Sequence, residues 1–231
     1  MPMIGTIGGV ALAAAVFVAS HIVLSSTPLR GVLVGRLGEA GFRVAYSAVA
    51  LAALVWLVAA HGVAPYVEIW GPSAATRHLP LVVMPFAAIL LVAGVTVRNP
   101  AGMIAPAPGG DAAPGILKVT RHPVMWAIAL WALAHMAANG DAASLLLFGA
   151  LALLALAGMA LIDRRKAAEL GAAWGPVLLT TSALPFAAMI SGRARFRFAE
   201  IGVWRVLAGV ALYLALLLLH GPVIGLTALP V

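Results

Sequence analysis

The chain has 231 residues, of which 64% are hydrophobic and only 9% are charged. Soluble globular domains carry about 25% charged residues, so this composition excludes an ordinary soluble protein. The 14 Lys and Arg residues outnumber the 7 Asp and Glu residues, but they lie in short stretches between apolar runs. They therefore indicate membrane topology and not nucleic-acid binding. Because the chain has no cysteine, disulfides, thiolate metal sites and covalently attached c-type haem are excluded.

Apolar runs of about 20 residues are long enough to cross the hydrocarbon layer as helices. Such runs predict six spans, over residues 4–26, 44–61, 79–97, 122–138, 143–162 and 202–220. We expect Pro80 in the first helical turn of the third span, where proline is tolerated. Asn139-Gly140-Asp141 is a turn signal that makes spans four and five an antiparallel hairpin, with Asp141 capping the fifth. The predicted fold class is all-α, a polytopic membrane helix bundle that forms a single domain over residues 1–231.

Two segments between the spans are broken by proline. Residues 99–116 contain four prolines and cannot be helical throughout. Residues 176–191 are apolar but short and are interrupted by Pro176 and Pro185. A re-entrant or interfacial segment therefore fits this stretch better than a seventh span.

The distribution of basic residues predicts the orientation in the membrane. Thirteen of the fourteen Lys and Arg residues fall in the connectors after spans one, three and five, and only Arg77 follows span two. The positive-inside rule places these three connectors in the cytoplasm. In the inner membrane of a bacterium, both termini would then be periplasmic.

Histidine is uncommon inside bilayers and usually faces the bundle interior, a water cavity or a ligand. His21 and His135 lie within spans one and four, His122 opens span four, and the other three histidines, His61, His78 and His220, lie near outer span ends. Neutral imidazole is a haem-iron ligand, and helix bundles build cofactor sites from facing helices. For each histidine the alternative is a structural hydrogen bond.

The start of span four carries Arg121 and His122 before Pro123. The exposed amides of a helix N-terminus attract anions. With Glu169 and Arg43 from connectors on the same side, we expect Arg121 and His122 to line a cytoplasm-facing pocket for an anionic headgroup, a haem propionate or a nucleotide-like cofactor. A capped membrane entry with a snorkelling arginine is the alternative. The charged run over residues 163–166 is interpreted as a stop-transfer anchor.

Several short motifs are spread over most of residues 10–195, and the segment from Arg121 to Gly149 is the most specific of them. The motifs are Phe17-Val-Ala-Ser-His21, Arg30, Leu37-Gly-Glu39, Phe42-Arg43, Tyr46-Ser47, Arg121-His-Pro123, Trp131 to Asp141, Leu147-Phe-Gly149, Asp163-Arg-Arg-Lys166 and Ser182 to Phe186. In these motifs the chain resembles the NnrU family, whose membrane domain also occurs in plant and cyanobacterial ζ-carotene isomerase.

This resemblance implies a membrane protein associated with denitrification, needed for the function or expression of nitrite and nitric oxide reductases. The related isomerase is a b-type haem protein with histidine ligands that acts on a carotene, a lipophilic substrate. By motif position its ligands would fall on His21 and His135, and its other histidines would correspond to His61 and His122. We therefore expect haem b with His21 and His135 as axial ligands and His61 as the reserve ligand, with Arg121 and Arg43 among the cofactor-binding residues.

A second resemblance leaves an alternative open. Arg121-His-Pro123, followed by Ala168-Glu-Leu-Gly-Ala-Ala-Trp174, resembles membrane methyltransferases that use S-adenosylmethionine, although Met125 stands where those enzymes have tyrosine. Three classes of function therefore remain: a haem-binding redox or isomerase protein, a methyltransferase, and a non-enzymatic membrane assembly factor. Membrane lipid is the expected partner, no nucleic acid is expected, and the sequence does not specify protein partners.

Overall fold

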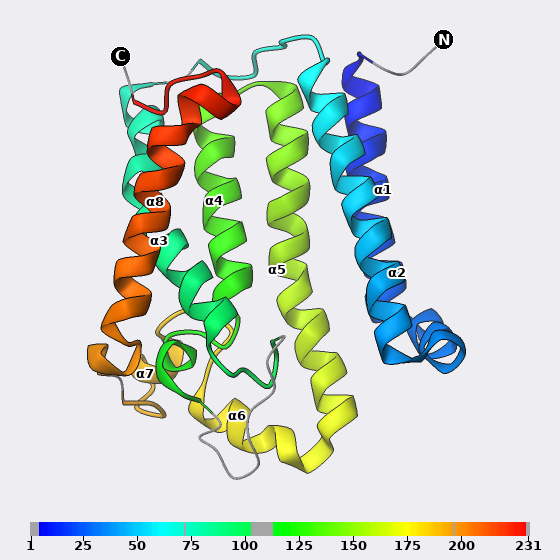
Figure 1. The fold of residues 1–231 in the computed structure, drawn as a ribbon, viewed down its shortest axis with the longest axis vertical. Helices are drawn as coiled ribbons and strands as arrows, with labels where there is room; N and C mark the ends of the chain where they lie inside the picture. Colours follow the sequence, from blue (N-terminus) through cyan, green and yellow to red (C-terminus); the bar gives the residue numbers. More distant parts are fainter. Residues whose placement is uncertain (1–4, 72, 103–112, 196, 230–231) are drawn as a thin grey trace.

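The computed structural model describes residues 5–71, 73–102, 113–195 and 197–229, and these residues form helices and connectors without a strand. Six long helices run alongside one another (Figure 1): α1 (Ile7–Ser26), α2 (Pro28–Gly62), α3 (Ala74–Thr96), α4 (Pro123–Asn139), α5 (Ala142–Leu170) and α8 (Val203–Ile224). The shorter elements are α6 (Gly175–Thr180), α7 (Ala187–Ile190) and the 3₁₀ turns η1 (Gly115–Lys118), η2 (Gly171–Trp174) and η3 (Phe198–Glu200).

The lengths of these helices fit a membrane protein. Five of the six long helices are long and apolar enough to cross a membrane, and α4, with 17 residues, is a shorter apolar helix. At about 1.5 Å per residue, α4 is roughly 25 Å long. The prediction of an all-α polytopic membrane bundle is confirmed.

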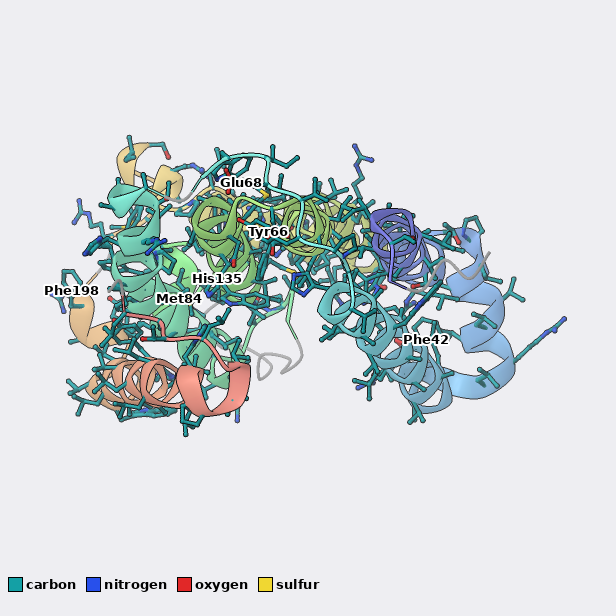
Figure 2. The ribbon with its side chains drawn as sticks, turned by 90° about the horizontal axis from the view of Figure 1, so that it is seen from above. Phe42, Tyr66, Glu68, Met84, His135 and Phe198 are labelled. Atoms are coloured by element: carbon teal, nitrogen blue, oxygen red, sulfur yellow. The ribbon has the colours of Figure 1, made fainter. Side chains whose placement is uncertain are left out.

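The helices are ordered in space as α8, α3, α4, α5, α1 and α2, and each packs against the next. Seen from above (Figure 2), they lie on an arc, with α8 and α2 on the same side at its two ends. Because α5 packs against α1, the middle of the chain lies beside its N-terminal helix. The core of this contact consists of small and branched side chains, among them Val10, Ala13, Leu57, Leu147 and Ala150.

Glycines allow close approach at two helix crossings. A Cβ atom on Gly94 of α3 would lie 2.8 Å from the Val124 side chain of α4, and one on Gly209 of α8 would lie 2.6 Å from the Cα atom of Ile89 in α3. In a membrane, apolar burial gives helices little reason to associate, so close van der Waals packing of small residues holds them together.

Both ends of the chain lie at one end of the bundle (Figure 1), which we call the terminal end. The other end of the bundle, which we call the basic end, contains the α1–α2 junction, the C-terminal end of α5 and the short helices α6 and α7. The proline-broken segment 176–191 is confirmed as short helices that do not span the bundle. The prediction for residues 99–116 falls largely on residues 103–112, which lie outside the described residues.

Three long helices extend beyond their predicted spans by five residues or more, among them α5, which ends eight residues after the predicted span. Helix α3 begins at Ala74, and Pro80 lies inside the helix and not in its first turn. The cause is a capping box in which the backbone N–H of Thr76 donates to the Ser73 hydroxyl, which starts the helix six residues before Pro80. Helix α2 begins at Pro28, sixteen residues before the predicted span, and is kinked at Gly38, where φ is 70°.

The predicted α4–α5 hairpin is confirmed, and the α2–α3 connector holds its turn in place. Gly140 ends α4 with φ 71°, and the Asp141 carboxylate caps α5 by accepting from the Ser144 N–H at 3.0 Å. The backbone N–H groups of Ile69 and Trp70 donate to the Gly140 carbonyl at 2.9 and 3.0 Å. The indole N–H of Trp70 also donates to the carbonyl of Ala137 at 3.2 Å.

We predict that Gly140→Ala destabilises the bundle. The new Cβ atom would lie 2.2 Å from the Trp70 carbonyl oxygen, and alanine disfavours a positive φ. The free energy of unfolding should fall by about 2 kcal/mol or more, measurable as a lower apparent Tm of the purified protein in detergent. The control is Gly149→Ala, whose Cβ atom would meet only the Met136 sulfur at 4.0 Å. Equal apparent Tm values for the two variants would contradict the prediction.

Candidate functional site

His135 lies on α4, about one helical turn from the terminal end of the bundle. Its ring packs against Trp131 and Phe148, with ring centroids 5.7 and 5.4 Å away. Its Nδ1–H donates to the Trp131 carbonyl at 2.8 Å. Among the described residues, nothing hydrogen-bonds its Nε2 atom, which is therefore available to a ligand. Figure 2 shows His135 on the side of α4 that faces the inside of the arc.

His61 approaches the same region from the end of α2. Its Nε2 atom lies 3.1 Å from the hydroxyl of Ser144, in the first turn of α5. Ser144 and Phe148 are four residues apart on α5 and so share one face of that helix. His61 and His135 therefore flank the same face of α5. His220, near the end of α8, also lies toward the terminal end, and its Nδ1–H donates to the Leu226 carbonyl at 2.7 Å.

His21 lies in a different place. It is about four turns from the terminal end of α1, and its ring contacts Phe17 and Tyr46, with centroids 4.4 and 5.7 Å away. Its Nδ1–H donates to the Phe17 carbonyl at 2.7 Å. Helix α5 lies between α1 and α4 in both views (Figures 1 and 2). The structure therefore does not bring His21 and His135 together, whereas it places His61 and His135 on one face of α5.

At the basic end, the carboxylate of Asp163 joins α5 to the start of α4. Arg121 donates to it from Nε at 2.9 Å and from Nη2 at 2.7 Å, and His122 Nε2 lies 2.8 Å from Oδ1. The Asn99 side chain donates to the Arg121 carbonyl at 3.0 Å. His122 is only 3% exposed, and the side chains of Arg121 and Asp163 are 12% and 19% exposed, so this network is partly buried between the helices.

Of the four residues predicted to line the cytoplasmic pocket, only Arg121 and His122 come together. Glu169 belongs to another group, with Lys166 Nζ at 2.9 Å and Arg30 Nη1 at 3.8 Å. It follows Asp163 by six residues, which rotates it about 240° around α5. Arg43 is exposed on α2 and makes no hydrogen bond or ion pair with any described residue.

The donor groups limit the chemistry of these sites. Within the described ranges, no group of three or more His, Asp or Glu side chains is placed to hold a metal ion. A b-type haem needs fewer protein ligands, because the porphyrin supplies four nitrogens and one or two imidazoles complete the iron. His61 and His135, near the terminal end of the bundle, offer imidazoles for a haem site of this kind.

A family model described as NnrU protein matches residues 10–228. The chain belongs to the NnrU family. The match includes the histidines at the terminal end, His21 and the Asp163 network, so the regions described above all lie within the NnrU domain. No curated protein and no solved structure matches the chain.

Asp163 is the residue of this NnrU protein whose role the sequence analysis missed. The run over residues 163–166 was interpreted as an anchor, yet its first residue points inward and binds Arg121 and His122. The position of the α4–α5 turn in the sequence indicates this contact. Folding the chain back at Gly140 places Arg121 opposite residue 159, about one turn from Asp163.

We predict that Asp163→Asn strongly destabilises the protein. Removing one partner of a largely buried ion pair leaves an uncompensated charge, here the Arg121 guanidinium, whose side chain is 12% exposed. The loss should be about 2 kcal/mol or more and should appear as a lower apparent Tm and a smaller yield of monodisperse protein. The matched control is Glu39→Gln, because Glu39 pairs with Arg30 while half exposed and should contribute about 1 kcal/mol or less. Comparable losses in the two variants would refute the central role of Asp163.

Proposed function

We propose that this NnrU family protein binds a b-type haem between its transmembrane helices near the terminal end, and that His135 is one of the residues that would hold it. The observation that carries the proposal is the setting of the His135 ring, which packs against Trp131 and Phe148 while its Nδ1–H donates to the Trp131 carbonyl. His21 and His78 make the same kind of hydrogen bond, so the aromatic setting and the position on α4 distinguish His135. Metal-bound histidines almost always donate their second ring N–H to such a partner, which fixes the tautomer and orients the other nitrogen. The chemistry of the residues present therefore fits the group.

As a second histidine that would hold the haem, His61 is better placed than His21. His61 and His135 flank one face of α5, whereas His21 is separated from His135 by α5 and lies deeper along its own helix. The present partner of His61 is the Ser144 hydroxyl, a neutral group. Exchanging this hydroxyl for a metal leaves no buried charge unpaired.

The surroundings of His135 suit a flat, apolar cofactor. Trp131 and Phe148 pack beside it, with their rings 5.5 Å apart and nearly perpendicular. Aromatic rings of this kind would bury a porphyrin face and exclude water from it. Haem, when bound, supplies one-electron redox or electrophilic chemistry, and the low polarity around it tunes its potential. In keeping with the family resemblance, we assign this chemistry to a redox or isomerase reaction on a lipophilic substrate, linked to denitrification.

The methyltransferase alternative loses its main support. Arg121 and His122, on which it rested, direct their side chains to Asp163. That arrangement satisfies both groups within the protein, so it gives them a structural role at the start of α4. The remaining alternative is a membrane assembly factor that binds no haem. The haem experiment below distinguishes it from our proposal.

Our prediction for haem concerns three variants of the purified full-length protein. His135→Ala should lower the haem content at least about tenfold, because loss of a ligand exceeds the effect of losing an outer-shell partner. His61→Ala should change the low-spin absorption spectrum, and His21→Ala should leave it unaltered. The control is His78→Ala, because His78 makes the same helical hydrogen bond at an exposed position.

Each result has a definite meaning. Full haem content in His135→Ala would overturn the assignment of the ligand. A changed spectrum in His21→Ala with an unchanged one in His61→Ala would restore the pair expected from the resemblance. Wild-type protein that takes up no haem on reconstitution would refute haem binding and leave the assembly factor.

We further propose that the basic end faces the cytoplasm of a bacterial inner membrane, so that both termini and the haem site lie toward the periplasm. We predict that alkaline phosphatase fused to the C-terminus is active and that a fluorescent protein fused there is dark. The same pair of reporters fused after Gly171, at the basic end, should give the reverse result. A bright C-terminal fluorescent fusion would overturn the orientation.

A further inference from the structure

A cavity of about 410 Å³ opens at the basic end, between the α1–α2 junction and the C-terminal part of α5. Its walls include Ser25, Arg30 and Gly31 on one side and Arg164 and Arg165 on the other. This volume falls in the range of small-molecule sites, about 300–1,000 Å³. The cavity is distinct from the histidines at the terminal end and from the Asp163 network.

The charge around this cavity is positive and incompletely neutralised. Four cations, Arg30, Arg164, Arg165 and Lys166, are close to only two carboxylates, those of Glu39 and Glu169. Two positive charges therefore remain in excess. Arg164 makes no ion pair or hydrogen bond with any described residue, although it lines the cavity.

Two of the three arginines that line the cavity, Arg30 and Arg165, are held in place by the protein. Arg165 donates from Nη1 to the Ser25 carbonyl at 3.2 Å, while its buried Nε atom makes no hydrogen bond with a described residue and lies 3.6 Å from the Glu169 carboxylate. Arg30 is fixed by Glu39 at 2.7 Å and lies over the ring of Phe42, 5.2 Å from its centroid. Preorganised guanidinium groups bind oxyanions with little loss of side-chain entropy.

The backbone adds to this preference for an anion. The first turn of α2, which begins at Pro28 after the cap Thr27, forms part of the cavity wall. The N-terminus of a helix carries a partial positive charge, which favours an anion such as phosphate. The N–H groups of Leu29 and Arg30 already donate to Thr27, so the backbone contributes through this charge and not through free donors. Gly31 contributes no side chain there, and a Cβ atom on it would have no neighbour within 4 Å.

We propose that this cavity binds the phosphate group of an anionic ligand, and that the ligand is a phospholipid of the adjacent leaflet. Arginine recognises phosphate through paired N–H donors, and the excess positive charge more than offsets the single negative charge of a phosphodiester headgroup. The position at the end of the hydrophobic part of α1 and α5 is the level of lipid headgroups. A soluble phosphate compound offers the same chemistry, so the experiment must separate the two sources. The proposal is independent of haem binding.

The test titrates the full-length protein in neutral detergent at constant ionic strength and follows its apparent Tm. The probes are short-chain phosphatidylglycerol, diacylglycerol with the same chains, and glycerol phosphate. We predict that phosphatidylglycerol stabilises the protein saturably and that diacylglycerol does not. In Arg164→Gln and in Gly31→Leu, which fills the cavity, the half-saturating concentration should rise at least about tenfold. Gly35→Leu is the matched control, because Gly35 also has open space around it but lies outside the cavity wall.

The outcomes separate the alternatives. Stabilisation by glycerol phosphate alone, lost in both cavity variants, would keep the phosphate site and refute the lipid as its ligand. An equal response to phosphatidylglycerol in wild type, Arg164→Gln and Gly31→Leu would overturn the site. Should Gly31→Leu fail to fold, Arg164→Gln alone decides, since Arg164 has no contacts to lose within the described protein. Haem content does not enter this readout, so the proposal can fail or hold separately from haem binding.

Discussion

The structure depends on the carboxylate of Asp163, which holds the start of α4 against the C-terminal part of α5. A guanidinium and an imidazole that are largely withdrawn from solvent need a partner within the protein, and Asp163 supplies it to both Arg121 and His122. At the other end of the same helix pair, the Gly140 turn is held by the α2–α3 connector. Fixed at both ends, the hairpin sets the position of His135 on α4.

Helix α5 is the wall shared by both proposed sites. Near its start, Ser144 and Phe148 contact His61 and His135, and near its end Arg165 reaches back to the α1–α2 junction. The two sites are therefore more than four helical turns apart along one rigid element. Such a separation suits a haem near one membrane face and a headgroup site near the other, with no chemistry shared between them.

The sequence predicts features that depend on neighbouring residues, such as spans, turns and caps, but not how the helices pack against one another. Apolar length predicted the spans, and Asn139-Gly140-Asp141 predicted the hairpin and the cap of α5. The lateral order of the helices was not predicted, because a membrane helix is apolar on all sides and its sequence does not mark the face that meets a neighbour. That α5 would insert between α1 and α4 follows only from the fold, and this insertion separates His21 from His135. The early start of α3 was missed because the Ser73–Thr76 cap prevailed over the proline signal.

His21 belongs structurally to the basic end and not to His135. Its carbonyl accepts the Ser25 hydroxyl at 2.6 Å, and Ser25 in turn lies on the wall of the arginine-lined cavity and binds Arg165 through its own carbonyl. Its ring meets Tyr46 of α2, which holds α1 and α2 together just above that cavity. The motif from Phe17 to His21 therefore shapes the junction that presents Arg30 and Arg165 to an anion. A histidine within a membrane span can thus be explained by the packing of a neighbouring site, without itself binding a metal.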